Sequence, residues 1–326
     1  MDRGEKIYVA GHRGLAGSAI VRRLRAAGYE NLALRTHAEL ELADAAAVRH
    51  FFEGERPRHV VLAAAKVGGI LANNTYPADF IAQNLAIETN VIEESYRAGV
   101  RRLLFLGSAC IYPRDCPQPI REEYLLTGPL EPTNRPYAIA KIAGVELCWA
   151  HNRQYGTRYF CAMPNNLYGP GDNYDLETSH VMAALIRKFH EAKARGEKSV
   201  VVWGSGTPRR EFVYSDDMAD ACVFLLELAE PRLDTLLSEA RPPIVNIGWG
   251  KDLTIRELAE QVRQTVGAEA GIVYDGTKPD GTPRKLLDVG KLRSLGWQPR
   301  VPLAEGLPLA YADFRSANVQ ITKPLF

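Results

Sequence analysis

The chain has 326 residues, of which 46% are hydrophobic and 24% are charged, a composition that excludes disordered, collagen-like and coiled-coil proteins. Its 40 Lys and Arg residues almost balance 39 Asp and Glu residues, and a net charge of +1 argues against bulk electrostatic binding to nucleic acid or to a membrane surface. That balance leaves room for a local basic pocket, and the length predicts two domains.

Short apolar runs alternate with helix-period segments along the first half of the chain. Strands are predicted at Ile7–Ala10, Leu32–Leu34, Val60–Ala64, Leu103–Leu106 and Tyr159–Met163, and helices at Leu15–Ala27, Ala45–Phe52, Ala78–Ala98 and Tyr137–Tyr155. This alternation predicts an α/β fold with a Rossmann-type doubly wound parallel sheet that is covered by helices on both faces.

After about residue 170 the pattern changes, and it predicts a smaller, discontinuous α/β domain. The elements expected from there on are Ser179–Arg195, Val200–Trp203, Asp216–Leu228, Ile244–Ile247 and Thr254–Val266, followed by a Gly- and Pro-rich stretch at 275–284. We expect residues 1–170 and about 215–250 to form a dinucleotide-binding domain. Residues from about 171 to 214 and from 251 to 326 are expected to bind the substrate.

Five cysteines are spread along the chain without a C-x-x-C pair, namely Cys110, Cys116, Cys148, Cys161 and Cys222. This pattern is a poor disulfide framework and a poor metal site, so it favours a reducing compartment and predicts no bound metal. The first apolar run ends before Gly11, too early for a signal sequence, and no later run is long enough to span a membrane. We therefore expect a cytoplasmic protein.

A G-x-x-G-x-x-G motif follows the first predicted strand and opens the first predicted helix. Gly11 permits the tight turn, Gly14 lets the backbone approach a pyrophosphate, and Gly17 allows close packing of helix on sheet. The phosphates would lie on free amides at the helix N-terminus. The motif predicts a dinucleotide site made of Gly11, His12, Arg13, Gly14, Leu15, Ala16 and Gly17, the alternative being a glycine-rich turn without a ligand.

Arg35 lies at the end of the second predicted strand, where an NAD-dependent enzyme usually carries an acidic residue that accepts from the ribose 2′-hydroxyl. A guanidinium suits a 2′-phosphate instead, with Arg13 assisting. The sequence thus favours NADP over NAD. The alternative is that Arg35 is an ordinary surface arginine.

Three residues near the fourth predicted strand form a candidate catalytic group. Ser108 comes just past the end of that strand, where residues face the ligand crevice and where a hydroxyl orients a substrate carbonyl. Tyr137 and Lys141 are four residues apart on one predicted helix, so they share a helix face. We expect the ammonium to lower the pKa of the tyrosine toward neutrality, so that Tyr137 transfers protons while Lys141 holds the nicotinamide ribose.

Together with the glycine motif, these residues resemble the extended short-chain dehydrogenase/reductase superfamily, which acts largely on nucleotide sugars. A narrower resemblance, to the GDP-L-fucose synthase family, rests on six further blocks. They are LAAAKVGGILANNTYPADF (Leu62–Phe80), FLGSACIYP (Phe105–Pro113), EPTNRPYAIAKIAG (Glu131–Gly144), MPNNLYGPGDNY (Met163–Tyr174), VVWGSGTPRREF (Val201–Phe212) and KPDGTPRKLLDV (Lys278–Val289).

That resemblance implies an NADP-dependent enzyme that converts GDP-4-keto-6-deoxy-D-mannose to GDP-L-fucose, by 3,5-epimerisation and then 4-keto reduction. It implies that Cys110 and His180 are the acid and base of the epimerisation, without saying which is which, and we expect Ser179 to cap the helix that carries His180. It also implies further cofactor contacts at Leu106, Gly107, Lys141, Pro164, Asn165, Asn166, Leu167 and His180.

The GDP-sugar is expected on the second domain, at Lys188, Trp203, Arg210 and Asp280. The tryptophan ring offers a stacking surface for guanine, and the arginine offers a bidentate clamp for the diphosphate. The alternatives are a core indole and, for Asp280, an ordinary Asp-Gly turn residue. The resemblance further implies a homodimer packed through the helices at 78–98 and 137–155.

Two positions depart from the expected family pattern: Ala109 stands where a second serine is expected, and Asn165 where a threonine is expected. They put substrate preference in doubt rather than the reaction class. The remaining alternatives are another nucleotide-sugar epimerase or reductase of the superfamily, and a non-catalytic dinucleotide sensor. A dehydratase would carry an acidic residue beside Ser108, and a sensor would typically lack Tyr137 or Lys141.

Overall fold

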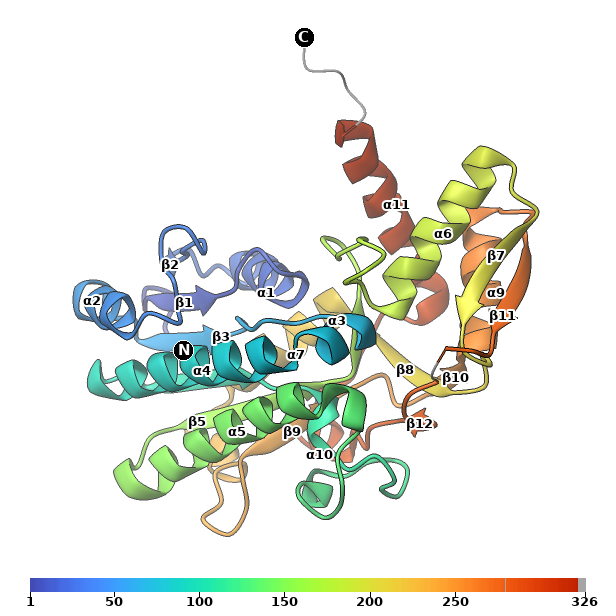
Figure 1. Ribbon diagram of the computed structural model, residues 1–326. Coiled ribbons are helices and arrows are strands. Elements are labelled where there is room, and N and C mark those ends of the chain that lie inside the picture. Colours follow the sequence, from blue (N-terminus) through green and yellow to red (C-terminus); the bar gives the residue numbers. More distant parts are fainter. Residues whose placement is uncertain (279, 322–326) are drawn as a thin grey trace.

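The computed structural model describes residues 1–278 and 280–321. A six-stranded parallel sheet with the order β2-β1-β3-β4-β5-β9 organises the first part of the molecule (Figure 1). Its strands are β1 (Ile7–Ala10), β2 (Leu32–Ala33), β3 (His59–Leu62), β4 (Arg102–Leu106), β5 (Tyr159–Pro164) and β9 (Ile244–Ile247). Since β2 and β3 lie on opposite sides of β1, the strand order reverses there and a ligand crevice opens at the carboxyl ends of β1 and β3.

Helices cover both faces of this sheet, as the sequence predicted. One face packs on α2 (Ala45–Glu55), α4 (Pro77–Arg97) and α5 (Arg135–Tyr155). The other packs on α1 (Leu15–Ala26), α7 (Ser215–Glu227) and the segment around α10 (Gly290–Ser294), near the short α8 (Glu230–Asp234). Alternate residues of β1 point to the two faces: Tyr8 and Ala10 to the first, Ile7 and Val9 to the second. The Rossmann-type doubly wound fold is therefore confirmed.

Two smaller sheets and three helices form the second part, which lies to one side of the large sheet (Figure 1). The strands β6 (Asn166–Tyr168), β10 (Asp252–Thr254) and β12 (Arg284–Lys285) all pair with β8 (Arg209–Tyr214), and β7 (Ser199–Trp203) pairs with β11 (Gly271–Asp275). The helices α6 (Val181–Arg195), α9 (Ile255–Val266) and α11 (Leu303–Ile321) share a separate apolar core with these strands.

Most predicted elements match the observed ones to within a few residues, but the predicted start of the helix that carries His180 is wrong. His180 is itself the N-cap residue of α6, with extended φ and ψ of −80° and 164°. The preceding residues are held in a loop by Asp175, whose carbonyl accepts from Ser179 N and whose carboxylate accepts from Thr178 N. Ser179 is therefore part of the loop, and α6 begins one residue after His180.

The sequence did not predict the helices α3 (Ile70–Thr75), α8, α10 and α11, or the strands β6, β8, β10, β11 and β12. The predicted substrate-binding range runs to residue 326, and its last five residues lie outside the described part of the chain. Across residues 1–278 and 280–321, none of the helices combines the length and the apolar character needed to cross a membrane.

Candidate active site

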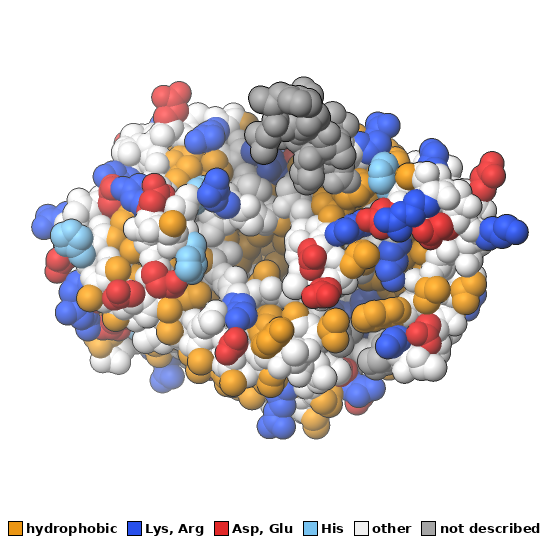
Figure 2. Space-filling model, turned by 45° about the horizontal axis from the view of Figure 1, so that its top comes forward, with side chains coloured by type: hydrophobic (Ala, Val, Ile, Leu, Met, Phe, Trp, Pro, Cys, Tyr) orange, Lys and Arg blue, Asp and Glu red, His pale blue; other side chains and the backbone are white. Residues whose placement is uncertain are grey.

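The face shown in Figure 2 is hollowed between the two parts of the molecule. The glycine loop lies at the crevice end of β1, where Gly11 has a positive φ of 80°. A Cβ on Gly11 would lie 2.8 Å from backbone atoms of Ala64, in the loop that follows β3. Only glycine fits this turn, because the backbone at Gly11 and the backbone at Ala64 lie so close together.

The second and third glycines of the loop have different roles, which substitutions separate. A Cβ on Gly17 would lie 2.6 Å from the carbonyl carbon of Gly11, a backbone atom that is held by the turn. We expect Gly17→Ala to lower the free energy of unfolding by about 3 kcal/mol. A Cβ on Gly14 meets only the Gly11 oxygen, at 3.5 Å, so Gly14→Ala should leave the melting temperature almost unchanged.

Because Gly14 faces the predicted pyrophosphate, Gly14→Ala should instead weaken NADPH binding about tenfold or more. Thermal unfolding and NADPH titration of both variants check this. A Gly14→Ala variant that binds NADPH as tightly as the wild type would contradict the predicted phosphate contact.

The residues around the loop fit a phosphorylated nucleotide. Arg13 and Gly14 are exposed at the surface of the loop. The Nδ1 atom of His12 is buried and has no hydrogen-bond partner within the described residues. The pKa of His12 is lowered, first because burial disfavours the charged ring and then because Arg13 lies close. An exposed cation and an unsatisfied ring nitrogen on a glycine loop suit a nucleotide with several phosphates.

Arg35 is not free at the end of β2. Its guanidinium forms an ion pair with Glu55, donates to the Leu34 carbonyl at 2.9 Å and lies over the Phe51 ring. Glu55 also pairs with Lys6 at 2.8 Å, so it keeps one cation if Arg35 turns toward a ligand. A 2′-phosphate would therefore compete with Glu55 for Arg35, whereas Arg13 makes no ion pair among the described residues.

We expect Arg13→Ala and Arg35→Ala each to raise the KM for NADPH about tenfold or more, the loss of one charge-assisted hydrogen bond. The KM for NADH, which has no 2′-phosphate, should change little. Arg25→Ala, on the exposed side of α1, is the matched control. A wild-type enzyme that prefers NADH would refute the assignment of NADP.

Ser108 and Tyr137 meet at the carboxyl end of β4. Ser108 comes two residues after the end of β4 and accepts a hydrogen bond from Cys110 N at 3.2 Å. Tyr137 is only 9% exposed and packs edge-on against Phe80. The pKa of Tyr137 is raised, chiefly by burial and further by Cys110 and Glu88, although a hydrogen bond with Ser108 lowers it. The phenol is thus held in its protonated form.

This corrects the expectation that Lys141 moves the pKa of Tyr137 toward neutrality. Lys141 is 2% exposed, and its ammonium pairs with the buried Glu88 at 3.1 Å and donates to the Leu106 carbonyl at 3.0 Å. The nitrogen lies 6.0 Å from the centre of the Tyr137 ring. Because a buried carboxylate balances the lysine charge, that charge does little to favour the phenolate.

Cys110 lies in the turn directly after Ser108, and residues from both parts of the molecule contact its sulfur. Asn134 donates to Sγ from its Nδ2 atom at 3.1 Å, and Lys285 donates from Nζ at 3.5 Å. The thiol also packs against the apolar cluster that contains Tyr137. Cys110 and Tyr137 therefore belong to one site.

His180 stands at the junction, at the start of α6, and solvent reaches it. Surrounding protein atoms nevertheless lower the pKa of His180, first by burial of the ring and then through the positive charge of Lys285. The lowered pKa favours the neutral form of the imidazole near neutral pH.

Trp203 and two lysines form the outer wall of the second part. The ring of Trp203, which is 49% exposed, lies 5.6 Å from Nζ of Lys188 and 5.3 Å from Nζ of Lys278. Lys188 also donates to the Val201 carbonyl at 3.0 Å, and burial lowers its pKa. An exposed indole between cations fits stacking on a base, so the alternative of a core indole is set aside.

Arg210 is partly buried, whereas Asp280 is exposed. The pKa of Arg210 is lowered by burial, against the opposing effects of Cys110, Glu131 and Asp280. Asp280 accepts from the backbone N and hydroxyl of Ser205, at 2.7 and 2.8 Å, so it holds the loop that follows Trp203. This carboxylate therefore has a structural role as well as any contact with a ligand.

Asn165, the departure from the expected threonine, is buried and satisfied. It donates to Glu211 at 2.6 Å and to the Lys285 carbonyl at 3.3 Å, and its oxygen accepts from Asn166 N at 3.1 Å. Its amide thus ties the end of β5 to β8 and β12. Leu106 and Gly107 lie at the carboxyl end of β4 and Pro164 at that of β5, whereas Leu167 lies on β6.

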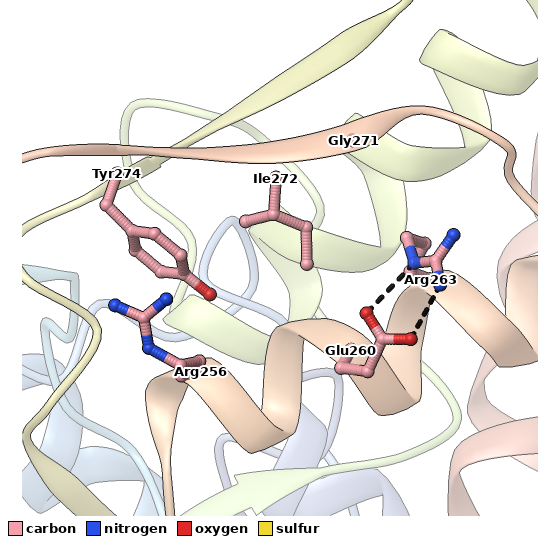
Figure 3. A pocket seen from close by; sticks show the side chains of 6 residues that line it. All are labelled: Arg256, Glu260, Arg263, Gly271, Ile272 and Tyr274. Atoms are coloured by element: carbon pink, nitrogen blue, oxygen red, sulfur yellow. Dashed lines mark hydrogen bonds and ion pairs between the residues drawn. The ribbon is translucent and has the colours of Figure 1, made fainter.

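A separate hollow of about 370 Å³ lies between α9 and β11, and it contains none of the predicted residues (Figure 3). Arg263 is paired there with Glu260, while Arg256 lies 4.0 Å from the centre of the Tyr274 ring and donates to the Ser205 carbonyl. Both cations are thus engaged within the protein. In the described part of the chain, no cluster of three or more His, Cys, Asp and Glu side chains could hold a metal ion.

Sequence reasoning missed Lys285, Asn134 and Glu88 as members of the site. Lys285 and Asn134 stand inside two of the family-like blocks, so the resemblance pointed to their neighbourhood but gave them no role. Nothing in the sequence marked Glu88, because its position on α4 reads as part of a polar helix face.

Residues 7–248 match the model of the NAD dependent epimerase/dehydratase family. The chain is 59% identical to GDP-L-fucose synthase 1 of Arabidopsis thaliana over 98% of this chain and 95% of the relative. It is 54% identical to GDP-L-fucose synthase of Escherichia coli over 95% and 96% of the two chains. Among solved structures, GDP-mannoheptose C4 reductase from Campylobacter jejuni with NADP bound is 38% identical and superimposes with a TM-score of 0.87, covering 97% and 99%.

Proposed function

Because this chain belongs to the NAD dependent epimerase/dehydratase family and, within it, to the GDP-L-fucose synthases, we propose that its cleft performs two reactions in turn. It converts GDP-4-keto-6-deoxy-D-mannose to GDP-L-fucose, by epimerisation at C3 and C5 and then by reduction at C4. The protein is an NADP-dependent oxidoreductase with epimerase activity. The observation that carries this assignment is Cys110, a thiol with two polar partners in the same recess as Tyr137.

The epimerisation uses the acidity that the C4 ketone gives to its neighbours. Removal of the proton on C3 or C5 leaves an electron pair that delocalises onto O4 as an enolate, and return of a proton on the opposite face inverts the centre. One face therefore needs a base and the other an acid. Cys110 and His180 are the groups for these roles, in an order that we leave open.

The reduction needs a proton donor at O4. When bound, NADPH supplies the hydride that reaches C4. Tyr137 hydrogen-bonds O4, first as the enolate and then as the developing alkoxide to which it gives its proton. Its raised pKa keeps the phenol protonated until that step. Ser108 orients the carbonyl, and Lys141 is positioned by Glu88 beneath the ring of Tyr137.

The second part of the molecule holds the nucleotide. Trp203 stacks on guanine, Arg210 and Lys188 bind the diphosphate, and Asp280 meets a ribose hydroxyl or the base. We retain as part of this proposal the division into a dinucleotide-binding domain (1–170 and about 215–250) and a substrate-binding domain (about 171–214 and 251–326).

One reaction mixture tests the function: the protein, GDP-4-keto-6-deoxy-D-mannose and NADPH, with the sugar product identified by NMR. We expect stoichiometric loss of NADPH absorbance and a product with the L-fucose configuration. A product reduced at C4 with C3 and C5 unchanged, or one formed without NADPH consumption, would favour another epimerase or reductase of the superfamily. Binding of NADPH without any turnover would favour a dinucleotide sensor.

A homodimer in the cytoplasm completes the proposal. The helices α4 and α5 pack on one another and each has 21 residues, and their exposed side chains include Tyr96, Ile139 and Tyr155. These side chains are exposed in a single copy, and packing against a second copy would bury them. Light scattering on the purified protein checks the dimer.

A further inference from the structure

A lysine from the small sheet contacts the thiol that the large sheet presents. Lys285 lies on β12, 175 residues after Cys110, and its Nζ is 3.5 Å from the sulfur. Asn134, just before α5, donates to the same sulfur at 3.1 Å. In both contacts the sulfur is the acceptor, which is the arrangement that a thiolate requires.

Strand pairing fixes the backbone position from which the side chain of Lys285 reaches the sulfur. The register of β12 on β8 places Lys285 opposite Arg210, whose charge also acts on Cys110. Asn165, directly after β5 of the large sheet, donates to the Lys285 carbonyl at 3.3 Å and so helps to hold its backbone. The lysine is thus held at the junction by groups from both parts of the molecule.

Other charged or titratable groups face the same sulfur or its cations. Glu131 is engaged by Arg114 and Thr282, and Tyr137 is held protonated by burial. Burial lowers the pKa of His180 and the ammonium of Lys285 lowers it further, so this one cation is within electrostatic reach of both epimerisation groups. Cys110 is contacted by Lys285 and Asn134 and interacts electrostatically with Arg210 and Tyr137. Around these groups, Glu131 acts on Arg210, and His180 is acted on by Lys285.

We propose that Lys285 is the positioning residue of Cys110: together with the Asn134 amide, its ammonium stabilises the thiolate through which Cys110 acts in epimerisation. The use of the thiolate in epimerisation rests on the proposed function. The stabilisation of the thiolate by Lys285 does not. As a base, Cys110 begins as thiolate and takes the C3 or C5 proton, leaving the electron pair on the enolate. As an acid, it gives its proton to the carbon and ends as thiolate, so Lys285 assists either role.

The experiment measures the thiolate without any substrate. Iodoacetamide, which is uncharged, alkylates thiolates with loss of iodide, and peptide mass spectrometry separates Cys110 from Cys116 and the buried cysteines. The rate at Cys110 is followed from pH 5 to pH 10 in the wild type, Lys285→Met and Lys285→Arg. Lys198→Met, at an exposed position before β7, is the matched control.

We expect Lys285→Met to move the midpoint of the alkylation profile up by about one pH unit and to slow alkylation at neutral pH about tenfold. Lys285→Arg and Lys198→Met should keep the wild-type midpoint, and NADPH should bind all variants equally. If Lys285→Met fails to fold, Lys285→Gln is measured in its place. An unchanged midpoint in the charge-removing variant, or a Lys285→Arg midpoint shifted as far, would overturn the proposal.

These outcomes are independent of the assigned reaction. A shifted midpoint in a protein that fails to make GDP-L-fucose would leave the lysine-thiolate pair standing and remove the proposed function. Where both hold, deuterium exchange from solvent into C3 and C5 should fall in Lys285→Met and recover in Lys285→Arg.

Discussion

Tyr137→Phe should lower the rate of hydride transfer to C4 by about 10²–10⁴-fold, the usual contribution of a positioned general acid. The substitution removes only the hydroxyl, because a phenylalanine ring keeps the contacts with Phe80 and Ala72. Epimerisation should slow less, since Cys110 and His180 remain. Single-turnover loss of NADPH absorbance measures the first rate, and NMR of deuterium incorporation at C3 and C5 measures the second.

Tyr155→Phe, at the exposed far end of the same helix, is the control and should transfer hydride at the wild-type rate. The raised pKa of Tyr137 adds a pH criterion. A donor whose pKa is raised stays protonated as the pH increases, so the rate of hydride transfer should not fall through deprotonation of Tyr137 between pH 7 and about pH 10. A loss of less than threefold in Tyr137→Phe would remove this residue from the chemistry.

The fold was predictable because its signals are local. A run such as Ile7–Ala10 is apolar throughout and too short for a helix, and α1 begins directly after the glycine loop, so strand, turn and helix are written within twenty residues. Where the prediction failed, the deciding contact was remote. Ser179 is a good N-cap residue, but Asp175 and the backbone of Gly69 hold the preceding residues in a loop, and the cap moves to His180.

The site was predictable residue by residue but not pair by pair. The spacing of Tyr137 and Lys141 correctly placed them on one helix. It gave no sign of Glu88 on α4, whose carboxylate balances the lysine charge and removes the expected effect on the pKa of Tyr137. Lys285 reaches Cys110 only because β12 pairs with β8 at the junction. Contacts of this kind depend on how two sheets meet, which periodicity along one chain does not encode.

Cys110→Ser should slow deuterium exchange from solvent into C3 and C5 by about 10²–10⁴-fold while NADPH binds as in the wild type. A serine hydroxyl is a far weaker acid than a thiol, so the anion that Asn134 and Lys285 are arranged to hold is no longer available. The side chain stays small, and the turn after Ser108 keeps its backbone contacts. Loss of exchange with retained cofactor binding therefore separates a failure of chemistry from a failure of folding.

Cys116→Ser is the matched control, because Cys116 is half-buried in the next turn of the same loop. The charge of Lys285 acts on Cys116 too, but no hydrogen bond joins them among the described residues. It should exchange deuterium at the wild-type rate. Exchange at that rate in Cys110→Ser would show that Cys110 is not an epimerisation group. Supplied with the epimerised 4-keto sugar, Cys110→Ser should still oxidise NADPH, whereas Tyr137→Phe should not, since the two steps use different proton donors in one cleft.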